Sequence, residues 1–111
     1  MASSKEFMEF VAEQMSLIEE IRYRKMFGEY GIYAFDKFFG MVCDNKLFIK
    51  ITNAGRNYLE NPVEDAPYPG AKLHFLIEEK IDDPTWLKEL ILRTVEELPA
   101  PKPKKKKKKE E

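Results

Sequence analysis

Four short segments rich in aromatic and β-branched residues follow one another between Tyr23 and Thr52, with only a few residues between them. Side chains of this kind favour strands. The pairs Asp36-Lys37 and Asp44-Asn45 are typical of two-residue hairpin loops. Loops this short join antiparallel neighbours, because a parallel crossover needs about a dozen residues or more. The pattern therefore predicts a four-strand antiparallel meander at residues 23–27, 30–35, 38–43 and 47–52.

Amphipathic helices are predicted at the two ends of the domain. Ser3, followed three residues later by a glutamate, fits a capping box, and apolar residues recur at helical spacing over residues 4–21. Near the other end, Asp83-Pro84 is typical of an N-cap followed by proline at the first helical position. This last helix is expected to run to about Leu98.

Between the meander and the last helix, the sequence predicts a short helix at residues 53–60, a proline-rich loop at 61–70 and a fifth strand at 72–79. Adjacent strands flanked by helices are typical of an α+β domain. We expect a two-layer fold in which the N-terminal, short middle and C-terminal helices lie mainly on one face of the antiparallel sheet.

Two-residue loops fix strand register, so the predicted hairpins divide the side chains of the meander between two faces. One face is wholly apolar and is expected to lie under the helices: Tyr33, Phe35, Phe38, Gly40, Val42, Leu47, Ile49 and Ile51. The other is mixed, and its apolar members predict an interface: Tyr30, Ile32, Phe39, Met41 and Phe48. Two alternatives stay open. The loop at 61–71 folds across this face, or a longer turn at 44–46 shifts the register.

The sequence shows no grouping of residues typical of catalysis or metal binding. His74 is the single histidine, and a lone histidine in a strand is more often a surface or interface side chain than a base or a ligand. Cys43 is the single cysteine, and a cysteine that ends an apolar strand is more often a buried, inert structural residue. The spacing of Gly28 and Gly31 fits neither a Walker nor a dinucleotide-binding loop. We therefore expect no enzyme activity, cofactor or metal. The alternative is a small-ligand site built from residues 28–31, the loop at 61–71 and His74.

Charge divides the chain into two parts. Residues 1–98 hold 12 Lys/Arg against 18 Asp/Glu, a net charge of −6, whereas residues 99–111 hold seven lysines against two glutamates, a net charge of +5. A folded domain at 1–98 followed by a disordered Pro/Lys-rich tail at 99–111 is expected. The tail predicts weak, nonspecific nucleic-acid binding by counterion release through Lys104, Lys105, Lys106, Lys107, Lys108 and Lys109.

The sequence favours a cytoplasmic protein. Its apolar stretches are far shorter than the ~20 residues of a membrane-spanning helix, and its N-terminus lacks the pattern of a secretory signal. A single cysteine suits a reducing compartment. We expect no membrane association.

The run Met26-Phe-Gly-Glu-Tyr-Gly-Ile-Tyr33 resembles the Met-Phe-Gly-Gly-Tyr-Gly signature of the TfoX N-terminal domain family, with Glu29 in place of the second glycine. Residues 36–42 and 45–50 resemble two of the family's strands, and residues 83–98 resemble its closing helix. The resemblance implies an α+β domain that often self-associates and carries no catalytic residues. In the family's best-known members a second, C-terminal domain follows, where this chain has the lysine-rich tail.

The resemblance also implies a non-enzymatic regulatory or interaction module. Such a module would be a transcription or competence co-regulator that acts through protein contacts, as a homodimer or with a protein of the transcription machinery. The alternative is an accessory protein that associates with nucleic acid through the tail.

Overall fold

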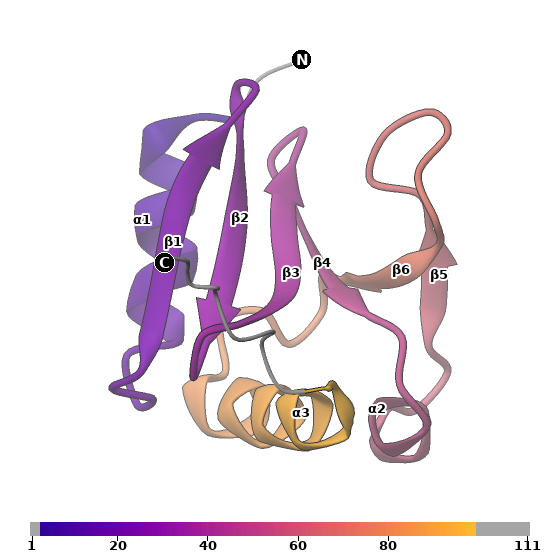
Figure 1. The fold of residues 1–111 in the computed structure, drawn as a ribbon. Helices are drawn as coiled ribbons and strands as arrows, with labels where there is room; N and C mark the ends of the chain where they lie inside the picture. Colours follow the sequence, from indigo (N-terminus) through magenta and orange to yellow (C-terminus); the bar gives the residue numbers. More distant parts are fainter. Residues whose placement is uncertain (1–2, 100–111) are drawn as a thin grey trace, which may run out of the picture.

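The computed structural model describes residues 3–99, which fold into one six-stranded antiparallel sheet and three helices (Figure 1). The strands are hydrogen-bonded in the order β1-β2-β3-β4-β6-β5. In chain order the elements are α1 (Lys5–Gln14), β1 (Ile21–Met26), β2 (Glu29–Ala34), β3 (Lys37–Cys43), β4 (Lys46–Lys50), α2 (Asn53–Tyr58), β5 (Val63–Asp65), β6 (His74–Ile77) and α3 (Pro84–Glu97). The predicted α+β class is confirmed, with one strand more than expected because β5 forms inside the predicted loop. The predicted tail lies outside the described residues, apart from Pro99.

The first helix is shorter than its apolar spacing predicts. Its N-cap is Ser4, whose hydroxyl accepts a hydrogen bond from the Phe7 amide at 3.1 Å. Ser3, the predicted cap, instead donates its hydroxyl proton to the Glu29 carboxylate at 2.6 Å. After Gln14 the chain turns, yet Ile18 stays 5% exposed in the core. Ile18 is therefore buried by the turn, although its apolar side chain had made the predicted helix too long.

The last helix begins where the sequence predicts. The Asp83 carboxylate accepts a hydrogen bond from the Trp86 amide at 3.1 Å, and Pro84 takes the first helical position, where a missing N–H costs nothing. At its other end, the Lys37 ammonium donates to the carbonyls of Val95 at 2.8 Å and Leu98 at 3.0 Å. Two carbonyls at the C-terminal end of α3 are thereby satisfied from the sheet.

Three tight hairpins connect β1 to β4, and both central residues of each turn have positive φ. The turns are Phe27-Gly28, with φ of 53° and 82°, Phe35-Asp36, with 54° and 63°, and Asp44-Asn45, with 54° and 56°. This conformation matches the right-handed twist of the flanking strands. The second turn lies one residue earlier than the predicted Asp36-Lys37.

That displacement, with a β-bulge, changes the register between β2 and β3. Tyr33 pairs with Phe38, but Ile32 pairs with Gly40, so Phe39 has no partner on β2. Relative to the predicted pairing, the remainder of β3 slips by one residue, and such a slip moves a strand's side chains to the opposite face. The predicted faces of β2 are therefore exchanged.

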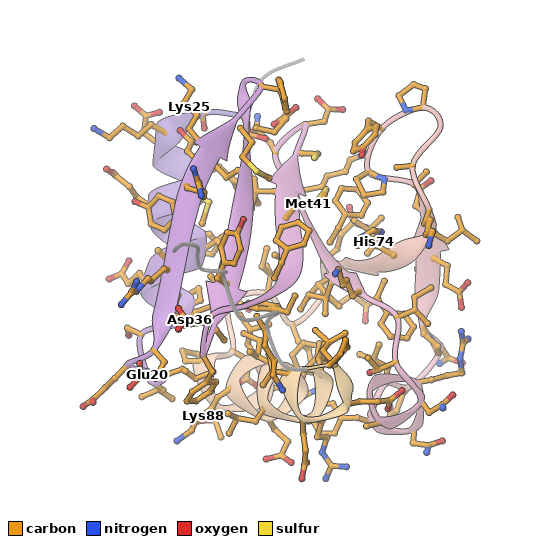
Figure 2. All side chains as sticks on the ribbon, viewed as in Figure 1. Glu20, Lys25, Asp36, Met41, His74 and Lys88 are labelled. Carbon is orange, nitrogen blue, oxygen red and sulfur yellow. The ribbon has the colours of Figure 1, made fainter. Side chains whose placement is uncertain are left out.

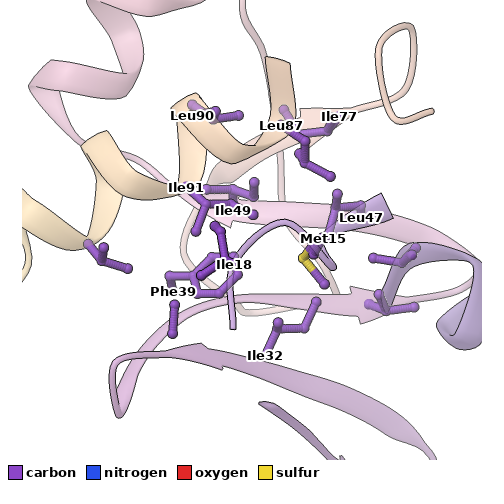
Figure 3. Close-up of a cluster of buried hydrophobic side chains, with 14 of the residues drawn as sticks. Met15, Ile18, Ile32, Phe39, Leu47, Ile49, Ile77, Leu87, Leu90 and Ile91 are labelled. Carbon is purple, nitrogen blue, oxygen red and sulfur yellow. The ribbon is translucent and has the colours of Figure 1, made fainter. Parts of the chain in front are cut away.

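The core lies between the sheet and the helices. In Figure 1, α1 lies behind β1 and β2, and α3 runs along the lower end of the sheet. Figure 3 shows side chains from both layers meeting: Met15 and Ile18 after α1, Ile32, Phe39, Leu47 and Ile49 from the sheet, and Leu87 and Ile91 from α3. On the same side, an added Cβ at Gly55 of α2 would meet Phe75 at 3.2 Å and Leu90 at 3.6 Å. All three helices therefore cover one face, and within residues 3–99 no helix covers the other.

Candidate interaction face of the sheet

We define the helix-free face as the side chains that strand register places away from the helices. Its apolar centre comes from five strands, and Figure 2 shows Met41 on β3 and His74 on β6. The apolar members are Met26 of β1, Tyr33 of β2, Phe38 and Met41 of β3, Phe48 of β4 and Leu76 of β6. Phe48 is 2% exposed and the other five are half-buried, while Val63 of β5, which pairs with Leu76 at the edge of the sheet, is 56% exposed. Apart from the buried Phe48, these are the side chains that a partner would meet on this side.

The structure corrects three of the five residues predicted for an interface. Ile32 and Phe39 are fully buried and Tyr30 is 9% exposed, and all three belong to the core beneath the helices. Their predicted place on the second face is wrong. The early turn and the bulge exchange the two faces of β2, which carries Tyr30 and Ile32, and the bulge turns Phe39 of β3 into the core. Met41 and Phe48 do lie on the predicted face, but Phe48 is 2% exposed, so Met41 is the predicted residue that stays an interface candidate.

Sequence reasoning missed Tyr33 and Phe38, which it assigned to the helix-covered side. Their rings lie 5.2 Å apart between centroids and are tilted by 50°. The side chains of Phe38 and Met26 also lie over Gly31, where an added Cβ would approach the Phe38 ring to 2.9 Å and the Met26 methyl carbon to 2.6 Å. Because Gly31 has no side chain, the side chains of Phe38 and Met26 can pack directly over its backbone. The glycine of the signature run was the signal that could have located them.

Basic side chains surround this apolar centre. Arg22 and Arg24 of β1 pair with Tyr33 and Gly31, and Lys46 and Lys50 of β4 pair with Cys43 and His74, so all four share the helix-free face. The Lys50 ammonium lies 4.8 Å from the centroid of the Phe38 ring, within cation–π range. Burial, with the nearby charge of Lys72, lowers the pKa of Lys50.

His74 lies 8% exposed beside Lys50. Its Nδ1 is 2.9 Å from the Lys72 carbonyl oxygen, which can only accept, so Nδ1 carries the proton. Its Nε2 is buried and has no hydrogen-bond partner among residues 3–99. Burial, and then the charge of Lys50, lower the pKa of His74 despite the carbonyl bond. The ring is therefore neutral at pH 7.

Cys43 closes one end of the same face. Burial, together with the charges of Glu29 and Asp44, raises the pKa of its thiol to about 11. The thiol stays protonated at neutral pH, and a protonated thiol is a poor nucleophile. Glu29 itself accepts hydrogen bonds from Ser3 and from the Asp44 amide, which ties the start of α1 to the turn between β3 and β4. The residue that departs from the family signature thus has a structural role.

The structure brings only part of the alternative ligand site together: β5, within the predicted loop at 61–71, pairs with β6 and sets Asp65 beside His74, but the two glycines lie apart. Gly28 and Gly31 belong to the β1–β2 hairpin, whereas His74 is on β6, with β3 and β4 between. An open depression of about 440 Å³ lies elsewhere, between α2, β5, β6 and the start of α3, and His74 does not line it. Within residues 3–99, no three His, Cys, Asp or Glu side chains group as metal ligands, and none of the described helices has the length and apolarity to cross a bilayer.

The lysines predicted to contact nucleic acid, residues 104–109, lie outside the described residues. The geometry of the described part is that of a sheet with helices on one side and an apolar, basic face on the other. Residues 13–98 match the TfoX N-terminal domain family. This chain belongs to that family.

The chain is also similar to a relative over most of its length. The TfoX N-terminal domain chain is 38% identical over 102 residues to an uncharacterized 12.7 kDa protein in the trpE 5′ region of Spirochaeta aurantia, and the match covers 92% of this chain and 89% of that protein. The family supports a regulatory or competence-related role. Its signature run contains the turn Phe27-Gly28 and the glycine at position 31 that shape the helix-free face.

Proposed function

We propose that this TfoX N-terminal domain chain is a non-enzymatic regulatory module that acts through protein contacts made by its helix-free face. One observation carries the proposal: the described helices all lie on one side of the sheet, while aromatic and methionine side chains gather on the other. Interface centres are enriched in aromatic residues, methionine and arginine. The partner is another protein or a second copy of the chain.

The proposal is tested by placing a charge in the centre of the face. In cells of the native host, the full chain with Met41→Glu should produce the same transcript changes as deletion of its gene, because a buried carboxylate disrupts an apolar contact. Leu17→Glu is the matched control, since Leu17 is 50% exposed in the turn after α1. It should preserve the wild-type transcript pattern.

Two further measurements complete the test. Circular dichroism must show that Met41→Glu is folded; a folded variant with wild-type transcripts would contradict the proposal. Light scattering on the purified chain tests the homodimer: a dimer that Met41→Glu converts to a monomer would identify the second copy as a partner. Repeating the measurement with DNA at low salt tests the alternative role of the lysines at 104–109, since such binding weakens steeply as salt rises.

A further inference from the structure

The helix-free face is basic on a domain whose other surfaces are acidic. Residues 1–98 carry a net charge of −6, yet the strands place Arg22, Arg24, Lys46 and Lys50 on this one face. Among the side chains that β1–β6 direct to the same side, two are carboxylates: Glu29 of β2, which is engaged by Ser3 and the Asp44 amide, and Asp65 of β5, which pairs with His74 at the edge of the sheet and accepts a hydrogen bond from the Ala66 amide. The four cations outnumber these two carboxylates, so a partner meets an excess of positive charge around an apolar centre.

A second copy is a poor electrostatic match for this surface. A twofold dimer places the same patch of both subunits in contact. Two helix-free faces brought together would set the arginines of β1 and the lysines of β4 against one another, and like charges facing each other across an interface are costly. The charge of the face thus favours a partner that carries carboxylates.

The setting of the Phe38 ring favours a protein over single-stranded nucleic acid. Base recognition on a sheet uses aromatic rings with an open face on which bases stack. The Phe38 ring is covered by the Lys50 ammonium at 4.8 Å from its centroid. It also lies against Gly31, where an added Cβ would come within 2.9 Å of the ring. The ring contributes an apolar, partly covered surface rather than a stacking platform.

From these observations we propose that the helix-free face docks an acidic protein segment, with apolar side chains against Tyr33, Phe38 and Met41 and carboxylates toward the arginines of β1 and the lysines of β4. This proposal rests on the proposed function and names the chemistry of its partner. Electrostatic complementarity of this kind selects the partner and accelerates association.

Site-specific crosslinking in the native host tests the proposal. Met41 of the full chain is replaced by the photoreactive amino acid p-benzoylphenylalanine, and the captured segment is mapped by mass spectrometry. The same replacement at Leu17 gives the background. We expect Met41 to capture a protein segment in which carboxylates flank apolar residues.

Charge reversal then tests how the segment is held. Arg22→Glu with Arg24→Glu should lower the capture at least about tenfold, and Asp/Glu→Lys changes in the captured segment should restore it. The matched control is Lys5→Glu with Lys25→Glu, which changes the total charge equally. Both control residues are exposed, and Lys25 lies on β1 but on its opposite side. Capture by this control should stay within about twofold of the wild type.

Each other outcome contradicts a different statement. Capture of a second copy alone would overturn the acidic partner and leave the proposed function intact as a homodimer. Capture of nucleic acid, or equal loss in both charge-reversed variants, would overturn the recognition of an acidic protein. Capture at Met41 no greater than at Leu17 would overturn the proposed function as well.

Discussion

At the scale of single residues, Phe39 and Met41 lie two positions apart in β3 but have different structural roles. The bulge turns Phe39 into the core, where it is fully buried, while Met41 lies half-buried on the helix-free face. We expect Phe39→Ala to lower the free energy of unfolding by about 3–5 kcal/mol, because it leaves a cavity in a packed core. Met41→Ala should cost less than half as much. Urea denaturation of both variants measures this, and equal losses would contradict the bulge.

His74 predicts a specific dependence of stability on pH. Its folded-state pKa lies below the ordinary value of 6.5, because burial and Lys50 oppose its charge. As pH falls below about 6.5 the unfolded chain takes up the proton first, so stability is lost until the folded-state pKa is reached. Above that window the residue contributes no pH dependence.

The variant His74→Gln isolates this contribution, because glutamine does not titrate. Free energies of unfolding are measured for both proteins from pH 8 to pH 5. The stability of the wild type should decline relative to His74→Gln on the acid side of about pH 6.5, since other titrating groups, Asp65 among them, are common to both. A difference that is constant over the whole range would contradict a lowered pKa.

At the scale of elements, the first hairpin contains an unfavourable residue. Phe27 has φ of 53° and is fully exposed, at 104% of its reference area. Asparagine adopts this conformation more readily, and Asn-Gly is the preferred pair for such a turn. Phe27→Asn should therefore raise the free energy of unfolding by about 0.5–1 kcal/mol, as measured by urea denaturation. A loss of stability would show that the ring makes a contact that holds the hairpin.

The α3 helix depends on a cap supplied by a strand. The Lys37 ammonium donates to two terminal carbonyls of α3. Its positive charge also interacts favourably with the negative end of the helix dipole. Lys37→Met keeps most of the stem and should lower the free energy of unfolding by about 1–2 kcal/mol. Lys88→Met, within the same helix, should change it by less than about 0.5 kcal/mol. Equal effects in thermal or urea denaturation would contradict the cap.

Most of the element order could be predicted from sequence, and the failures have physical causes. Asp83-Pro84 and Asp44-Asn45 were informative because these residues favour caps and left-handed turns. Phe35 gave no such signal, since a bulky side chain rarely adopts positive φ. β5 escaped prediction because it is only three residues long, Val63–Asp65, within a proline-rich stretch.

The error in the turn between β2 and β3 affected the prediction of the candidate site more than the prediction of the fold. A one-residue displacement leaves the strands in place but exchanges their faces. Tyr33 and Phe38 were therefore placed in the core, and Ile32 and Phe39 on the surface, the reverse of what the structure shows for all four. The bulge depends on how Phe39 packs beneath the helices, which is tertiary information. The face assignment of Met41 and Phe48 survived because the turn between β3 and β4 was correct.

At the scale of the whole molecule, one core connects every helix to the sheet. Side chains of α1 and α3 share a single buried cluster with β2, β3, β4 and β6. The Glu97 carboxylate accepts hydrogen bonds from the Asn53 and Ala54 amides, which joins the end of α3 to the start of α2. Trp86 packs against Tyr58 with ring centroids 5.7 Å apart, which joins the same two helices at another point. Local unfolding of any of these elements would expose part of the common core.

This connectivity predicts a single cooperative unfolding transition. Trp86 is the one tryptophan of the chain, so its fluorescence reports the α2–α3 contact, whereas far-ultraviolet circular dichroism reports the whole sheet and all the helices. The two probes should give the same urea midpoint and slope, because small domains with one core unfold in an all-or-none manner. An earlier fluorescence transition would mean that α2 and α3 separate from the sheet first. In that case Lys37→Met should advance the fluorescence transition alone, since its cap is the hydrogen-bonded tie between α3 and β3.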